Sequence, residues 1–145
     1  RFHMLGYRVL AEPSSVVYHK NAVTLPMHSQ KKYYLNHRNS LYMLCSNYSI
    51  PLTVYLLPLR IVLDVIAFFY AMSKLDWKHM TAIVMAIFWL ISHPHLIFKK
   101  RRKNIHIKSV RDRDIIKNMF RGSIVLVHYI LRKKTYREIV TNAES

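Results

Sequence analysis

Two groups of polar residues in the first forty positions have the chemistry to bind a ligand. His19 lies near the end of the extended run VVYHK, and an imidazole can ligate a divalent metal or hold a structural hydrogen bond. Arg38 precedes Asn39, and a guanidinium can grip diphosphate oxygens through a two-pronged hydrogen bond, with charge added by Lys31 or Lys32. The same residues could instead solvate a polar helix face or meet lipid phosphates.

Several other kinds of site are excluded by the sequence. Only 2 glycines are present, which argues against a nucleotide-binding loop, because such loops need glycine where the backbone approaches phosphate. No Ser-His-Asp, Cys-His or His-Glu-x-x-His arrangement occurs. His93 and His95 flank a proline with no carboxylate or thiol nearby, which disfavours a metal pair. The single cysteine, Cys45, rules out an intrachain disulfide and is expected to be a small core residue.

The basic charge of the chain is concentrated near its end. The formal net charge is +16, and of the 23 Lys and Arg residues six lie in residues 1–50, three in 51–98 and fourteen in 99–145. A basic block directly after an apolar run is typical of the cytoplasmic flank of a membrane segment and of contact with anionic lipid. Anionic lipid is therefore the expected partner, and nucleic acid is not expected.

Hydrophobic periodicity predicts the elements that must position these residues. Residues 7–11 and 16–19 have the composition of two short strands, which alone bury too little to be stable in water. From residue 30 to about residue 45, apolar residues recur at helical spacing and predict an amphipathic helix. These elements would place His19 at the end of a strand and Arg38 on a helix.

Residues 51–72 and 80–98 predict a hydrophobic helical hairpin, because both runs are long enough to cross about 30 Å of hydrocarbon. Arg60 and Asp64 count against the first run, although their spacing of four allows them to pair. That run therefore either spans the bilayer or lies at its interface. The second run carries no formal charge and is the stronger candidate, and the basic flanks would place both chain ends in the cytoplasm.

The tail, residues 99–145, predicts one short amphipathic helix. Ser109 and Asp112 have the spacing of a capping box, and Gly122 is a stop signal. The apolar run at 123–131 is too short to span a membrane and is expected to lie on it or to pack against another domain.

Three motifs in this order resemble the C-terminal part of bacterial family 2 glycosyltransferases of the rhamnosyltransferase-like type. They are GYRV at residues 6–9, PSSVVYHK at 13–20 and KKYYLNHRN at 31–39, followed by the apolar hairpin. The resemblance implies a mostly α chain with a short β-strand remnant of a GT-A α/β domain. Its expected parts are residues 1–48 as the end of that domain, 49–98 as the membrane hairpin and 99–145 as a basic cytoplasmic tail.

The resemblance also implies a function. The whole enzyme would transfer a sugar, with inversion, from a nucleotide-sugar to a lipid-linked or polysaccharide acceptor at the bacterial inner membrane. In this chain Tyr18, Arg38 and Asn39 would contact substrate, and His19 would help to bind Mn²⁺ or Mg²⁺. The catalytic aspartates would lie upstream, so this chain alone is expected to be inactive. The alternative is a small non-enzymatic basic membrane protein that binds anionic lipid or nucleic acid.

Overall fold

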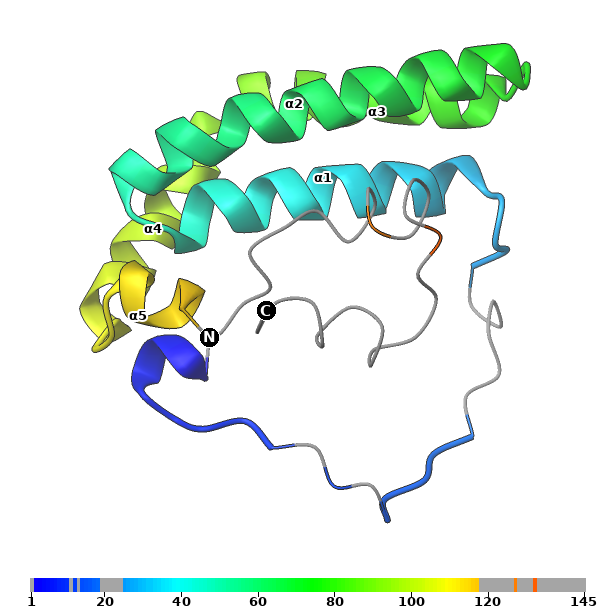
Figure 1. The fold of residues 1–145 in the computed structure, drawn as a ribbon. Coiled ribbons are helices and arrows are strands. Elements are labelled where there is room, and N and C mark those ends of the chain that lie inside the picture. The colour runs from blue at the N-terminus through cyan, green and yellow to red at the C-terminus, as the bar shows by residue number, and fades with distance from the viewer. Residues whose placement is uncertain are drawn as a thin grey trace. The chain divides into compact units, whose positions relative to one another are not determined.

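The protein is mostly helical in a computed structural model that describes residues 2–10, 12, 14–18, 25–117, 127 and 132 (Figure 1). The chain divides into two compact units, residues 1–109 and 110–145, which are described separately below. The elements are η1 (His3–Leu5), α1 (Gln30–Asn47), α2 (Ile50–Ser73), α3 (Trp77–Ser92), α4 (Pro94–Ile107) and α5 (Asp112–Ile116).

Helix α1 confirms the amphipathic helix predicted from about residue 30 to residue 45. It begins after Ser29, whose side-chain oxygen accepts a hydrogen bond from the backbone N–H of Lys32 at 3.3 Å. This bond satisfies one of the amide groups that a helix leaves unpaired at its start. Leu41 and Cys45 lie on the inner face of α1 and are buried, as expected for Cys45.

Helix α2 matches the first apolar run within a residue at each end, and α3 follows it after a short turn. The turn between them is tight, with Leu75 in the left-handed backbone region at φ 54°. Asp76 then starts α3 by accepting a hydrogen bond from the backbone N–H of His79 at 3.1 Å. An Asp in this position is a favoured helix start.

The prediction of one continuous helix over residues 80–98 is wrong. Helix α3 ends at Ser92, α4 begins at Pro94, and the two axes are bent by 70°. The residue before a proline is disfavoured in helical conformation, and Pro itself suits the first turn of a new helix. Pro94 was the sequence signal for this break. As a result the cluster Lys99–Lys103 is part of helix α4.

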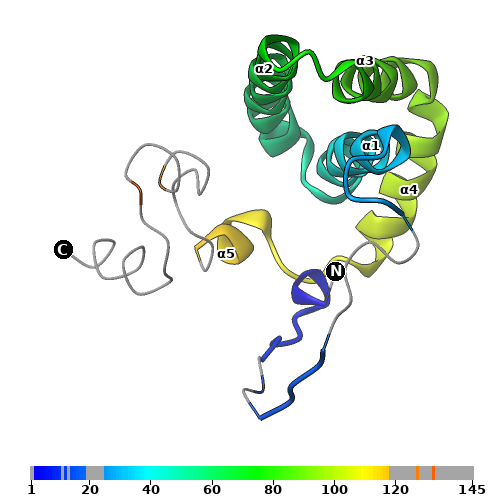
Figure 2. The ribbon, with the colours of Figure 1, turned by 90° about the vertical axis from the view of Figure 1, so that its right-hand side faces the viewer.

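The first unit is a three-helix bundle in which each of α1, α2 and α3 contacts the other two, and α4 lies at one end of it (Figure 2). Helices α1, α2 and α3 are seen nearly end-on in Figure 2, and α1 packs most extensively against α3. The contacts are made largely by small or fully buried side chains: Leu41, Ala71, Ala82, Ile83 and Ala86. Small residues allow helix backbones to approach closely, as in helix packing within membranes.

Much of the apolar surface of this unit is not covered by protein. Among the described residues, α2 alone has the length and hydrophobicity to cross a membrane, and α3 with α4 would count as a second span if the bent pair were one segment. Only 6% of the apolar window in α2 is buried. An exposed apolar face of this extent is evidence, by composition, for association with a membrane.

The predicted strands at 7–11 and 16–19 are not formed in the parts of them that are described, residues 7–10 and 16–18. The physical reason is the one that the sequence already suggested, because two short strands without further partners bury too little surface. The chain enters this segment through η1, which Gly6 ends with a left-handed φ of 83°.

In the second unit the only helix among the described residues is α5, and the predicted capping box is wrong. Helix α5 starts after Arg111, without a side-chain cap bond. Ser109, the last residue of the first unit, instead donates hydrogen bonds to the carbonyl of Met4 within that same unit. Gly122 and nearly all of the apolar run at 123–131 lie outside the described residues, so those predictions remain open.

Candidate functional site

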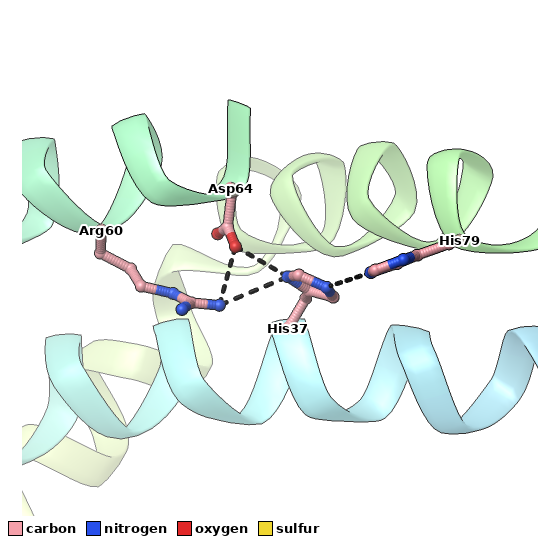
Figure 3. A network of polar contacts seen from close by, with 4 residues as sticks. All are labelled: His37, Arg60, Asp64 and His79. Carbon is pink, nitrogen blue, oxygen red and sulfur yellow. Dashed lines mark hydrogen bonds and ion pairs between the residues drawn. The ribbon is translucent and has the colours of Figure 1, made fainter. Parts of the chain in front are cut away.

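A buried carboxylate in an apolar helix is the centre of the most concentrated polar cluster in the first unit (Figure 3). The Asp64 side chain on α2 is only 1% exposed. Its Oδ1 atom lies 2.7 Å from Nη2 of Arg60, one helical turn earlier, as the spacing predicted. An ion pair within one helix partly compensates the cost of removing both charges from water.

His37 joins this pair from α1. Its Nδ1 atom lies 2.7 Å from Asp64 Oδ1, and its side chain is 13% exposed. Because an ionised carboxylate can only accept, His37 Nδ1 must carry a hydrogen and donate it. Arg60 Nη2 also lies 3.3 Å from His37 Nδ1, but two donors cannot bond each other. This contact is therefore a consequence of both groups reaching the same oxygen.

His79, in the first turn of α3, completes the cluster. Its Nε2 atom lies 3.0 Å from Nε2 of His37, so one of these nitrogens donates and the other accepts. The Tyr33 ring stacks on the His79 ring, with 4.2 Å between centroids and an interplanar angle of 14°. Burial lowers the pKa of His79, the charge of His37 lowers it further, and Asp76 and Asp64 oppose both effects.

Tyr33 links the cluster to the solvent-exposed start of α1. Its hydroxyl lies 2.8 Å from Nδ1 of His28, which is exposed. Burial raises the pKa of Tyr33, and the negative charge of Asp76 adds to this effect. Polar groups therefore continue from the surface at His28 to the buried carboxylate of Asp64.

This arrangement joins three helices through a continuous chain of polar contacts, from Arg60 and Asp64 on α2 through His37 on α1 to His79 on α3. Polar groups in such a chain polarise one another and strengthen each other's hydrogen bonds. Within the described residues no group of three or more His, Cys, Asp or Glu side chains has the arrangement of a metal site. The spacing of Arg60 and Asp64 predicted their pairing, whereas no sequence pattern predicted that His37 and His79 join them. A partial signal was present, since charges in an apolar helix require polar partners on its neighbours.

The residues predicted from sequence to bind substrate lie on a different side of α1. Asn39 Oδ1 accepts hydrogen bonds from Arg38 Nε at 3.2 Å and from Arg38 Nη2 at 2.8 Å. The Arg38 guanidinium also lies 5.4 Å from the ring centroids of Tyr34 and Trp89. Cation–π contacts of this kind orient a guanidinium while leaving it partly accessible. Arg38 and Asn39 are thus held together as a pair.

The other two predicted site residues are not brought to this pair. The Tyr18 side chain is 96% exposed, so it makes almost no packing contact with the rest of the protein. His19 lies outside the described residues, and the prediction that it binds metal remains open.

A second polar junction joins α4 to the end of α1. Arg101 Nη1 and Nη2 donate to the carbonyl oxygens of Cys45 and Tyr48 at 2.6 Å and 2.7 Å. Asn104 donates to the carbonyl of Ser46 at 2.9 Å. These bonds satisfy carbonyl groups that a helix leaves unpaired at its end. Beside the junction is an open groove of about 340 Å³, lined by apolar side chains and by Arg101.

No protein-family model, curated protein or solved structure matches this chain.

Proposed function

We propose that this chain is the membrane-attached C-terminal part of an inverting glycosyltransferase of family 2 type. The whole enzyme would use a nucleotide-sugar donor and a lipid-linked or glycan acceptor in cell-surface glycan synthesis. The order of GYRV, PSSVVYHK and KKYYLNHRN supports the family, and the reactive aspartates are expected in the domain that precedes these motifs.

The observation that carries this proposal is that one small group of helices presents both a polar pair and an uncovered apolar surface. Arg38 and Asn39 lie on α1, and Asn39 is exposed. The outer faces of α2 and α3, in the same helix bundle, expose large apolar side chains. A transferase that joins a water-soluble donor to a lipid-linked acceptor needs these two surfaces close together. The apolar groove beside Arg101 is a further place for acceptor hydrocarbon.

In this proposal the Arg38 guanidinium holds the leaving diphosphate, because its planar fork matches phosphate oxygens. Asn39 now occupies the Nε and Nη2 hydrogens of that fork and would release them when the donor binds. Tyr18 would contact substrate. His19 would complete the shell of Mn²⁺ or Mg²⁺ beside two upstream aspartates, and the metal would neutralise the diphosphate.

The test uses the complete enzyme, whose coding sequence is expected to contain an Asp-x-Asp motif about a hundred residues upstream of GYRV. Arg38→Ala should raise KM for the nucleotide-sugar, and Arg38→Lys should recover little because it lacks the planar fork. Ser40→Ala, at an exposed position of the same helix, is the matched control. An upstream sequence without a transferase domain would end the proposal, as would an unchanged KM in the Arg38 variants.

A second candidate function is a non-enzymatic membrane protein that binds anionic lipid. It is favoured by one observation: α4 contains five consecutive cations, of which Lys99, Arg102 and Lys103 are exposed. This function predicts vesicle binding that depends on anionic lipid and no sugar transfer by any longer form of the protein. Nucleic acid would replace lipid as the ligand only if a duplex or single strand bound with a steep dependence on salt.

A further inference from the structure

Helix α1 runs alongside α3 in the same direction, and their contacts extend over almost the full length of α1. Gln30 donates to the Thr81 hydroxyl at 2.8 Å, which places the start of α1 next to the start of α3. Tyr42 and Trp89 meet edge to face near the middle, with 5.6 Å between ring centroids. The end of α1 receives Arg101 from α4. If α3 crossed a bilayer in this structure, α1 would have to cross beside it.

The segment before α1 would then have to cross the bilayer as well. The backbone N–H of Ser109 donates to the carbonyl of Met4 at 2.8 Å, so Met4 lies just beyond α4, at the end of the helix bundle that is far from Gln30. Residues 5–29 must therefore cover the length of α1, about 27 Å for 18 residues. The described part of this segment is neither helix nor strand except for the end of η1, and it includes Arg8 and Glu12.

The described residues of this segment beyond η1 cannot lie in hydrocarbon in this irregular conformation. Their backbone N–H and C=O groups would have neither water nor regular partners, and each unsatisfied group costs several kcal/mol in lipid. Irregular backbone at membrane depth occurs only where protein covers it or where it lines a water-filled cavity. The contacts within residues 1–109 are therefore incompatible with an α2–α3 hairpin that stands upright across the bilayer.

The exposed faces of the three helices are also divided by polarity. At 100° per residue, most of the exposed side chains of α2 lie within one half of its circumference. All the large exposed ones are apolar: Ile50, Val54, Tyr55, Leu59, Val62, Leu63, Val65, Ile66, Phe69, Tyr70 and Met72. Exposed apolar residues on α3 are Trp77, Val84, Met85, Phe88 and Ile91. The exposed face of α1 is polar apart from Met43, with Gln30, Lys31, Asn36, Asn39 and Ser40.

Exposed cations are found at both ends of the helix bundle. Lys74 and Lys78 lie at the turn between α2 and α3, and Lys99, Arg102 and Lys103 lie on α4 at the other end. If the helix axes lay parallel to the membrane surface, both groups would be within reach of the headgroups of the same leaflet. Lysine and arginine stems can rest on apolar surface while their charges meet lipid phosphate.

We infer that residues 1–109 lie in the plane of one leaflet of an anionic phospholipid bilayer and do not cross it. The apolar faces of α2 and α3 enter the acyl region, and the polar face of α1 remains in water. The Arg60–Asp64 pair turns inward toward α1, away from lipid. This inference rests on the membrane attachment in the proposed function and not on sugar transfer.

The orientation in the membrane can be tested with single thiols at the two ends of the helix bundle. In a Cys45→Ser background, Lys74→Cys marks the turn and Lys103→Cys marks α4. The full chain is bound from outside to sealed vesicles of phosphatidylcholine and phosphatidylglycerol, and a membrane-impermeant maleimide is added. We expect both thiols to be labelled completely without detergent. Full protection at position 74, relieved by detergent, with free labelling at position 103 would overturn the inference.

A pair of charge-matched variants tests which face enters the lipid. Val62→Asp, on the exposed face of α2, should greatly reduce flotation with these vesicles, whereas Asn36→Asp, on the exposed face of α1, should reduce it little. Equal losses would overturn the assigned faces. If the unmodified chain does not float with the vesicles, both the proposed membrane attachment and this inference are wrong. If it floats but only position 103 is labelled from outside, the attachment stands and this inference alone is wrong.

Discussion

His37 and His79 point their Nε2 atoms at each other across α1 and α3 at 3.0 Å. Since His37 Nδ1 is committed to Asp64, this pair has room for one added proton and not for two. Two imidazolium ions would aim N–H at N–H at hydrogen-bond distance. The contact therefore couples the packing of three helices to pH.

The free energy of unfolding should fall in mild acid. Burial and the charge of His37 lower the pKa of His79 in the folded protein, so the unfolded state binds more protons as pH falls. The contribution of His79 to stability is therefore present above the ordinary histidine pKa and is lost as pH decreases. The expected slope is at most about 1.4 kcal/mol per pH unit.

This prediction can be measured by denaturant unfolding in detergent micelles between pH 5 and pH 7.5. His79→Gln removes one titrating partner while retaining a polar side chain, and it should flatten the slope. His95→Gln, at an exposed histidine on α4, is the matched control and should leave the slope unchanged. An equal slope in all three proteins would show that the pair does not couple pH to stability.

Removal of the buried carboxylate should destabilise the fold strongly. Asp64→Asn leaves Arg60 as an unbalanced charge that is only 24% exposed, and breaking a buried pair costs about 3 to 5 kcal/mol. The double variant Arg60→Met with Asp64→Leu should recover most of this loss, since it removes both charges at similar volume. Unfolding by denaturant measures both effects, and a double variant no better than Asp64→Asn would contradict the pairing.

Arg101 and Arg102 are neighbours on α4 with different expected effects on stability. Arg101→Ala removes two charge-assisted hydrogen bonds to the end of α1 and should cost about 1.5 to 3 kcal/mol. Arg102 is exposed, and Arg102→Ala should change stability by less than about 0.5 kcal/mol. Thermal unfolding of the two variants in the same micelles provides the comparison. Similar losses would mean that Arg101 does not hold α4 against α1.

Cys45 should react slowly in the folded protein. Burial raises the pKa of its thiol, partly offset by the positive charge of Arg101, so less thiolate forms at a given pH. Its contribution to stability is present below the ordinary thiol pKa and is lost as pH rises through the folded value. Maleimide labelling between pH 7 and pH 9 should be slow until denaturant is added. Labelling as fast as that of a free cysteine would contradict the burial of this thiol.

Local pattern was sufficient to predict most of the helical structure. The spacing of apolar residues predicted α1 and α2 within about two residues, and the four-residue spacing of Arg60 and Asp64 predicted their ion pair. These features depend on neighbours in the chain, so they are readable from composition and period. The break at Pro94 was equally local and was overlooked because the apolar run continued through it.

The candidate cluster depended on contacts that no local pattern contains. His37, Asp64 and His79 come from three helices. They meet only because α1 and α3 run side by side in the same direction and α2, which runs in the opposite direction, packs against both (Figure 1). The contact between Ser109 and Met4 likewise joins residues that are 105 positions apart. The sequence alone determined most of the helical segments, which segments are apolar and where the cations lie. Only the tertiary structure decided which polar groups contact one another and how the apolar faces can meet a membrane, because both depend on the relative placement of helices.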